Sequence, residues 1–176
     1  MEDVLLRSQA LVESFAALVR SELPDGAEIF DAHVHLGTDI DGMVGDFDEL
    51  VAGQELYGVS GAFMFCLDEP DRHPSFSAAN DRTVAYAERS NGRFVPFVRL
   101  DLTEEPIAEA TRCLDAGARG IKLHPRAQKF HLNDERLDPV FALAAERGVP
   151  ILIHGGEACR RSPTAWPSSS SGMTPS

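Results

Sequence analysis

Three short segments of the sequence place histidines at the ends of apolar runs. In the first, Asp-Ala-His-Val-His-Leu-Gly, one residue separates His33 from His35. Because side chains alternate along a strand, the two imidazoles would point to the same side, about 6.6 Å apart along the strand. Imidazole nitrogens bind zinc at about 2.0–2.1 Å, so this spacing predicts two ligands of one metal ion. The alternative interpretation is a pair of histidines satisfied by hydrogen bonds in a turn.

The second segment, Gly-Ile-Lys-Leu-His-Pro, places Lys122 and His124 on one face of a strand by the same alternation. Burial of a lysine is unfavourable unless the ammonium is paired or chemically modified, which favours an ion pair over a metal-bridging carboxylated lysine. We predict a catalytic role for His124 and a substrate-binding role for Lys122. Metal binding by His124, or a supporting role behind a ligand, stays open.

The third segment, Ile-Leu-Ile-His-Gly-Gly, ends an apolar run at His154, and its two glycines leave room for a ligand. As the third imidazole at a strand end, His154 is predicted to bind the metal. Arg99 and Asp101 end another apolar run on one face. They are expected to line the cavity, with Arg99 binding substrate, or to pair with each other. His73, in a polar loop, and His131, before a helix cap, are interpreted as solvated surface.

These residues lie in a regular alternation of apolar runs and helical patterns. After an N-terminal helix at residues 4–20 with one buried face, strands are predicted at 27–36, 62–67, 94–100, 119–124 and 149–154, and helices at 47–57, 80–89, 106–115 and 134–147. The alternation implies βαβ units in a parallel sheet. A parallel barrel has its active site at the carboxyl ends of the strands, where the histidines fall. An open doubly wound sheet is the runner-up, but no Gly-rich phosphate loop follows the first strand.

The amino-acid composition argues against some classes of binding partner. Acidic residues outnumber basic ones by 28 to 16, and the net charge of −12 argues against nucleic acid or an anionic membrane. The three scattered cysteines and the acidic N-terminus favour a cytoplasmic location, and the apolar runs are too short to cross a bilayer. The sequence contains no Gly-x-Ser-x-Gly elbow and no Walker loop. A small-molecule substrate is therefore expected, and homo-oligomerisation is left open.

Taken together, the three motifs resemble those of the amidohydrolase superfamily, in particular the amidohydrolase 2 branch that includes aminocarboxymuconate-semialdehyde decarboxylase-like enzymes. The resemblance covers residues 27–156. It implies a (β/α)8 TIM barrel with a divalent metal, often zinc, held by His33, His35 and His154. Such a metal lowers the pKa of bound water and polarises the substrate. The implied function is hydrolysis of a small amide, ester or lactone, with decarboxylation of an aromatic or unsaturated carboxylic acid as the alternative.

The chain departs from this family in its length. The family uses a further aspartate after strand eight as ligand and proton shuttle, and no residue here matches it. We therefore expect an incomplete barrel over residues 1–156, with about five strands, and a disordered tail at 157–176, which is rich in Ser and Pro. Read one base out of step, GC-rich codons for the first eight tail residues can encode Arg-Gly-Leu-Pro-Pro-Ile-Ala-Asp, which would continue the barrel. Our hypothesis is a truncation by a single-base deletion or a sequencing error. Two other interpretations are open. The chain is a non-catalytic fragment, or it is a half-barrel closed by a second copy or a partner chain.

Overall fold

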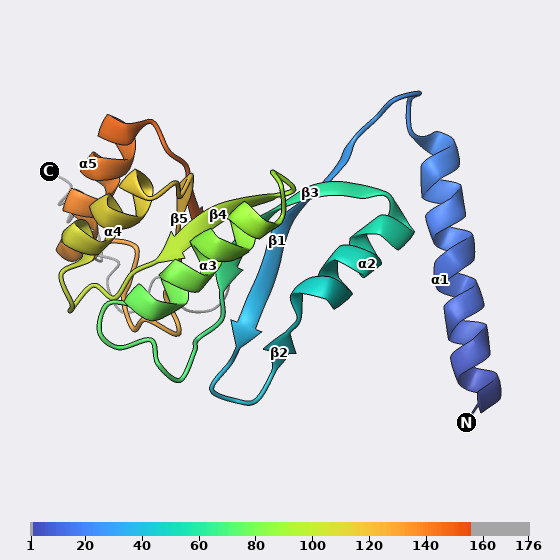
Figure 1. Ribbon diagram of the computed structural model, residues 1–176, viewed down its shortest axis with the longest axis horizontal. Helices are drawn as coiled ribbons and strands as arrows, with labels where there is room; N and C mark the ends of the chain where they lie inside the picture. Colours follow the sequence, from blue (N-terminus) through green and yellow to red (C-terminus); the bar gives the residue numbers. More distant parts are fainter. Residues whose placement is uncertain (1, 156–176) are drawn as a thin grey trace, which may run out of the picture.

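The computed structural model describes residues 2–155, and these form one curved sheet with helices along its outer side (Figure 1). The strands are β1 Ile29–Thr38, β2 Val44–Gly45, β3 Val59–Cys66, β4 Phe94–Arg99, β5 Gly120–Leu123 and β6 Ile151–Ile153. The helices are α1 Glu2–Glu22, α2 Phe47–Tyr57, α3 Ser77–Arg89, α4 Pro106–Asp115, the 3-10 helix η1 Glu135–Leu137 and α5 Asp138–Arg147. The tail predicted at 157–176 lies outside the described residues.

The sheet has the order β2-β1-β3-β4-β5-β6. Five of its strands, β1, β3, β4, β5 and β6, are parallel neighbours in chain order, with α2, α3, α4 and α5 as the crossovers between them. This is the strand–helix repeat of a (β/α)8 barrel, present here as an incomplete, curled arc. The predicted fold class is confirmed, and so are the five strands and four connecting helices. The short antiparallel β2, which pairs with the end of β1, was not predicted.

Local signals in the sequence set the ends of the crossover helices. Helix α2 begins after Asp46, whose carboxylate accepts hydrogen bonds from the backbone N–H groups of Asp48 and Glu49. It ends at Gly58, which adopts a left-handed conformation with φ 70°. Helix α5 ends in the same way at Gly148, with φ 63°. These caps explain why the bounds of α2 were predicted to the residue.

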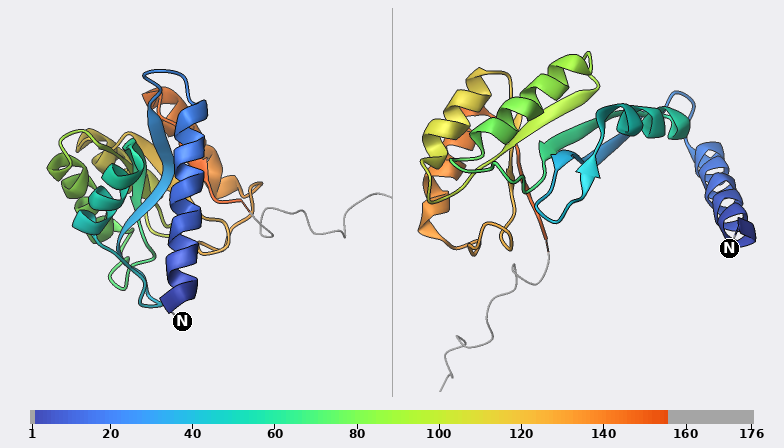
Figure 2. Two further views of the ribbon diagram at one scale, coloured as in Figure 1. Left: turned by 90° about the vertical axis from the view of Figure 1, so that its right-hand side faces the viewer. Right: turned by 60° about the horizontal axis from the view of Figure 1, so that its bottom comes forward.

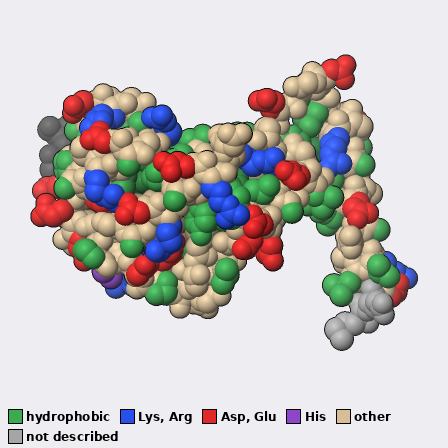
Figure 3. Space-filling model, in the orientation of Figure 1, with side chains coloured by type: hydrophobic (Ala, Val, Ile, Leu, Met, Phe, Trp, Pro, Cys, Tyr) green, Lys and Arg blue, Asp and Glu red, His purple; other side chains and the backbone are tan. Residues whose placement is uncertain are grey.

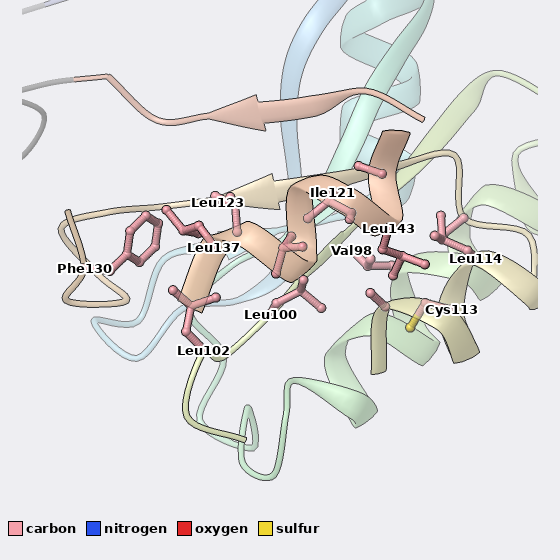
Figure 4. Packing of buried hydrophobic residues seen from close by; sticks show 14 residues of the cluster. Val98, Leu100, Leu102, Cys113, Leu114, Ile121, Leu123, Phe130, Leu137 and Leu143 are labelled. Atoms are coloured by element: carbon pink, nitrogen blue, oxygen red, sulfur yellow. The ribbon is translucent and has the colours of Figure 1, made fainter. Parts of the chain in front are cut away.

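The larger core cluster lies between the outer face of the sheet and helices α4 and α5 (Figure 4). Strands β4 and β5 contribute Val98, Leu100, Ile121 and Leu123 to this cluster, and the helical side includes Leu114, Leu137, Val140 and Leu143. Because side chains alternate along a strand, the residues between these apolar ones face the inside of the arc. Arg99 and Lys122 are two of them, so the core packing itself places two cations on the concave face.

The first strand breaks the predicted alternation at one position. Val34 and Leu36 are buried in a second core cluster against α2, as expected. Strict alternation along the strand would place Ala32 with them, but Ala32 is exposed. The pairing of β1 with β3 shifts register between Asp31 and Val34, and this irregularity interrupts the two-residue period. The register is regular again at Val34, so His35 points away from the α2 side of the sheet.

Helix α1 stands apart from the rest of the molecule (Figures 1 and 2). The helix was predicted correctly, but its apolar face is not buried: Val4, Leu11 and Phe15 are 64%, 70% and 64% exposed. Hydrophobic side chains are visible at the surface of this helix in Figure 3. A hydrogen bond of 3.0 Å from the Arg20 guanidinium to the Leu56 carbonyl connects it to α2. Within residues 2–155 no element packs over this face, which is why the prediction of burial is wrong. No helix in this part of the chain is long and apolar enough to cross a membrane.

Candidate active site

A cavity of about 890 Å³ opens at the carboxyl ends of the parallel strands. Its walls come from each of these strands or from the loop that follows it, and include His33, His35, Asp68, His73, Arg99, Asp101, His124 and His154. All but one of the residues predicted to form the site therefore lie at one place, although up to 121 positions separate them in sequence. The exception is Lys122, which is buried and does not line the cavity.

His33 and His35 point their Nε2 atoms at each other, 3.1 Å apart. The Nδ1 atom of His35 lies 3.4 Å from the carbonyl oxygen of Cys66. A carbonyl only accepts hydrogen bonds, so this contact assigns the proton to Nδ1 and leaves the lone pair on Nε2. Two nitrogens bound to one cation at about 2.0–2.1 Å lie about 3 Å apart. The donor set and its spacing therefore fit a shared metal ion.

The protonation states of His33 and His35 are also compatible with metal binding. Burial, with the neighbouring charge of His33, lowers the pKa of His35 to about 4. Burial and the charge of Lys122 also lower the pKa of His33. Both imidazoles are thus neutral at neutral pH, which is the form that binds a metal. The edges of the two rings contact the buried Phe65, with ring centres 4.8 Å and 4.5 Å away, so β3 holds their orientation.

His154 reaches the same cluster from the other end of the sheet. Its ring centre is 6.5 Å from that of His33 and 3.8 Å from that of His124, with which it is stacked. Two imidazoles on one ion have ring centres about 5–6 Å apart. The His33–His154 distance is slightly longer than this, so the two rings lie near the separation that a shared ion requires.

His124 carries its proton on the opposite nitrogen. The backbone N–H of Ala127 donates a hydrogen bond of 3.2 Å to its Nδ1 atom, so the proton of the neutral ring lies on Nε2. Burial, with the charges of His154 and Arg99, lowers the pKa of His124 to about 4 and keeps the ring neutral. The amide of Gln128 accepts from the His124 N–H and donates to the Leu100 carbonyl, which fixes the loop. Of the roles left open for His124, this geometry favours a hydrogen-bond donor to a substrate.

Gly37, at the end of the first motif, lies against Glu69, a residue that was not predicted to belong to the site. Gly37 has φ +103°, and a Cβ atom there would lie 2.3 Å from a carboxylate oxygen of Glu69. Glu69 is buried and pairs with Arg82 of α3. The glycine therefore leaves room for the carboxylate of this ion pair. No local pattern shows this contact, because 32 positions separate the two residues.

Within residues 2–155, neither of the two predicted ion pairs, that of Lys122 or that of Arg99 with Asp101, is present. Lys122 is 1% exposed, and its Nζ has no hydrogen-bond partner among these described residues, with the Phe65 ring centre 4.6 Å away. Burial, with the charge of Arg99, lowers the pKa of Lys122 to about 8. The alternative that Arg99 pairs with Asp101 is also wrong. Asp101 instead accepts hydrogen bonds from the N–H and hydroxyl of Thr103, at 2.8 Å and 2.6 Å.

His73 belongs to a cluster that the sequence analysis did not assemble. Its Nδ1 is 3.0 Å from a carboxylate oxygen of Glu104, and one ligand atom each of His73, Asp101 and Glu104 lies within 4.8 Å of the others. The interpretation of His73 as surface is half right, because its side chain is 54% exposed yet borders the cavity. The position of His73 in a loop that follows a strand was the one feature of the sequence that could have predicted its place at the cavity.

The amidohydrolase family model matches residues 30–173, which is more than half of the chain and includes the histidines of the cavity. The chain belongs to the amidohydrolase family. Among solved structures, this amidohydrolase is similar to a probable 2-pyrone-4,6-dicarboxylic acid hydrolase from Acinetobacter baumannii with citric acid bound. The TM-score is 0.54 at 10% sequence identity, over 73% of this chain and 50% of that chain. At this identity the likeness shows the fold alone.

Part of the chain is also similar in sequence to enzymes of another class. Pyridoxine 5'-phosphate synthases of Xylella fastidiosa strains M23 and M12 are 33% and 32% identical to it over 78 residues. The match covers 44% of this chain and 27% of each of those proteins. The chain thus spans about a quarter of the length of the curated relatives it matches and half of the solved structure. Family membership rests on the family model and not on these short matches.

Proposed function

We propose that this amidohydrolase is a metal-dependent hydrolase of a small amide, ester or lactone, with His33, His35 and His154 as ligands of one divalent cation, zinc in the first instance. One observation carries the proposal: the Nε2 atoms of His33 and His35 face each other at 3.1 Å, and the contact of His35 with Cys66 leaves its Nε2 lone pair available. Family membership supports it. The identification of a solved relative as a probable hydrolase of 2-pyrone-4,6-dicarboxylic acid also supports hydrolysis.

The cavity residues have separate roles in this proposal. A divalent cation, when bound, lowers the pKa of water and polarises a carbonyl. His124 donates a hydrogen bond from Nε2 to the oxygen on which negative charge develops, and its low pKa prevents it from adding a full charge to the site. Arg99 and Lys122 bind the substrate, Arg99 from the cavity wall and Lys122 through the positive field of a buried ammonium.

Metal binding is tested by titrating the full chain with Co²⁺ and following its visible absorption, with the metal content determined by elemental analysis. We expect one equivalent, and at least a tenfold loss of affinity in His33→Ala, His35→Ala and His154→Ala. His73→Ala is the matched control, because His73 borders the same cavity in the separate cluster with Asp101 and Glu104. Loss of binding in His73→Ala, with the other three variants unaffected, would move the site to that cluster.

The reaction is tested on a panel of lactones, esters and amides that includes 2-pyrone-4,6-dicarboxylic acid, with and without added Zn²⁺. Acid release at constant pH reports hydrolysis. Release of carbon dioxide reports decarboxylation, which was the alternative drawn from the sequence. Metal-dependent acid release that falls in His124→Ala supports the proposal, whereas carbon dioxide as the product rejects it.

A further inference from the structure

Two exposed apolar side chains lie on the wall of the cavity. Ile40 is 55% exposed and Met43 is 54% exposed, and both line the cavity that contains His33 and His35. Single exposed apolar residues are common on protein surfaces, but two that share the wall of a concavity offer a place for an apolar ligand. Both belong to the hairpin that joins β1 to β2 (Figure 1).

The sequence specifies the geometry of this hairpin. Strands β1 and β2 pair in antiparallel fashion, and the Asp39 N–H donates a 2.7 Å hydrogen bond to the Met43 carbonyl oxygen, which leaves a short loop at 40–42. The last residue of the loop, Gly42, has φ +90°, the left-handed conformation that hairpin loops of this length require there. The Gly42 N–H donates a 3.0 Å hydrogen bond to the Asp39 carbonyl oxygen. The loop is therefore a tight turn that carries Ile40 at its start and Met43 at its end.

Hydrogen bonds also fix the hairpin to the loop that follows β3. The Ile40 N–H donates a 3.1 Å hydrogen bond to the Asp68 carbonyl oxygen, and the Asp68 N–H donates one of 3.1 Å to Oδ2 of Asp39. The other carboxylate oxygen of Asp39 accepts a 3.2 Å hydrogen bond from the Asp41 N–H. The two apolar side chains are thus held in place before any ligand binds. A site that is fixed in advance loses less conformational entropy on binding.

The hairpin presents one of its faces to the cavity. Met43 lines the cavity, whereas the next residue, Val44, is 66% exposed and is not among the lining residues. Successive side chains of an extended segment point to opposite faces, which accounts for the difference. The buried side chains of Leu67 and Phe76 add apolar surface to the cavity lining. The cavity therefore combines an apolar region with the histidine cluster.

We propose that Ile40 and Met43 form an apolar subsite that binds a hydrocarbon group of the substrate. As a statement about substrate this rests on the proposed function, but the binding step is measured without turnover. The substrate class is then an amide, ester or lactone that carries a hydrocarbon group of several carbons. Binding removes that group and the two exposed side chains from water, and this supplies the affinity.

The test is isothermal titration of the full chain with butanamide, hexanamide and octanamide, neutral amides that differ only in the length of the hydrocarbon chain. Metal is removed beforehand with 1,10-phenanthroline, so that the metal-dependent reaction does not consume the amides. A fully buried methylene group contributes about a fourfold gain in affinity. We expect octanamide, with four more methylene groups than butanamide, to bind at least tenfold more tightly, which allows for partial burial.

Two substitutions make the subsite polar while approximately keeping its shape. Ile40→Thr and Met43→Gln should each weaken octanamide binding at least threefold and change butanamide binding less than twofold. Val44→Thr is the matched control, because Val44 is an exposed apolar residue of the same hairpin outside the cavity lining. It should bind all three amides as the wild type does. Asp39→Ala removes the carboxylate that fixes the hairpin, so octanamide should bind more weakly to this variant.

Several outcomes would overturn the proposal. Equal affinities for the three amides, or no detectable binding of octanamide, would do so. So would a gain with chain length that persists in both Ile40→Thr and Met43→Gln, or one that Val44→Thr loses to the same extent. Self-association of the chain in size-exclusion chromatography that Met43→Gln abolishes would assign the side chains to a contact between copies. Circular dichroism checks folding, and if one variant does not fold, the other variant and the chain-length series decide.

The two proposals fail separately. Binding that depends on chain length and on Met43, by a chain that hydrolyses nothing, would reject the proposed function and leave the apolar subsite standing. Metal-dependent hydrolysis with a KM that is independent of acyl length and unaffected by Ile40→Thr and Met43→Gln would do the reverse.

Discussion

The side-chain amide of Asn80 hydrogen-bonds to both the N–H and the carbonyl oxygen of Arg99, so α3 fixes the last residue of β4. The same amide donates a 2.8 Å hydrogen bond to Glu109 of α4. Glu109 in turn accepts hydrogen bonds from Arg112, Ser77 and Cys113. A buried polar network therefore joins two helices and a strand behind the cavity, and it determines where Arg99 stands.

Replacement of Asn80 by Ala is expected to lower the free energy of unfolding by about 1–3 kcal/mol, because it removes the partners of two buried backbone groups. Urea denaturation with an unchanged m-value measures this. Asn133→Ala is the control, since Asn133 is exposed. A loss below about 0.5 kcal/mol would show that water or a shifted chain satisfies the Arg99 backbone instead.

The network also predicts a pH dependence. Burial raises the pKa of Glu109, but hydrogen bonds from Arg112, Asn80, Cys113 and Ser77 outweigh it, and the net pKa is lowered. The Glu109 charge thus stabilises the fold above the pKa of an unfolded glutamate, about 4.3, and this contribution is lost as the pH falls through the lower folded value. Glu109→Gln should be destabilised by about 1–3 kcal/mol at pH 7, and its difference from the wild type should shrink as the pH falls from 7 through the folded pKa of Glu109. A difference that stays constant over this range would contradict the assignment.

Gly37→Ala tests the contact between Gly37 and Glu69, close to the proposed metal ligands His33 and His35. An added Cβ would meet the Glu69 carboxylate at 2.3 Å, on a backbone with φ +103°. We expect a loss of about 1–3 kcal/mol in stability together with weaker Co²⁺ binding, because the ion pair of Glu69 with Arg82 must move. The control is Gly53→Ala, where a Cβ meets nothing within 4 Å. Intact stability and metal affinity in Gly37→Ala would show that the loop adapts freely.

Zinc is expected to stabilise the chain by mass action. A ligand at 100 times its Kd adds about 2.7 kcal/mol to the free energy of unfolding. Thermal denaturation with and without Zn²⁺ measures the shift, and 1,10-phenanthroline should reverse it. His35→Ala should show no shift. A shift of equal size in that variant would place the bound zinc elsewhere.

Lys122→Met is expected to raise the free energy of unfolding by about 1 kcal/mol, because an apolar chain of similar length replaces a buried ammonium that forms no hydrogen bond within the described residues. Urea denaturation checks this, and Lys129→Met provides an exposed lysine for comparison. Destabilisation by more than about 1 kcal/mol in Lys122→Met would reveal a partner for the ammonium.

Periodicity and capping residues predicted the elements of this fold well, since both signals are local. The meeting of His33, His124 and His154 was also predictable, because carboxyl ends of parallel strands share one edge. What could not be predicted were contacts between loops far apart in sequence, such as that of His73 with Glu104. The expected ion pair of Lys122 failed for a related reason: alternation gives the face of a side chain but not its partner.

The three proposed metal ligands are His33 and His35, which lie in β1, and His154, which directly follows β6; these are the first and the last of the described parallel strands. A cation bound by all three side chains would cross-link β1 to the end of β6, the two ends of the parallel part of the sheet. The measured metal affinity would then include the elastic energy of bending the sheet. Any substitution that flattens the sheet, even far from the histidines, should weaken metal binding. The affinity for the metal would then report how strongly the sheet is curved.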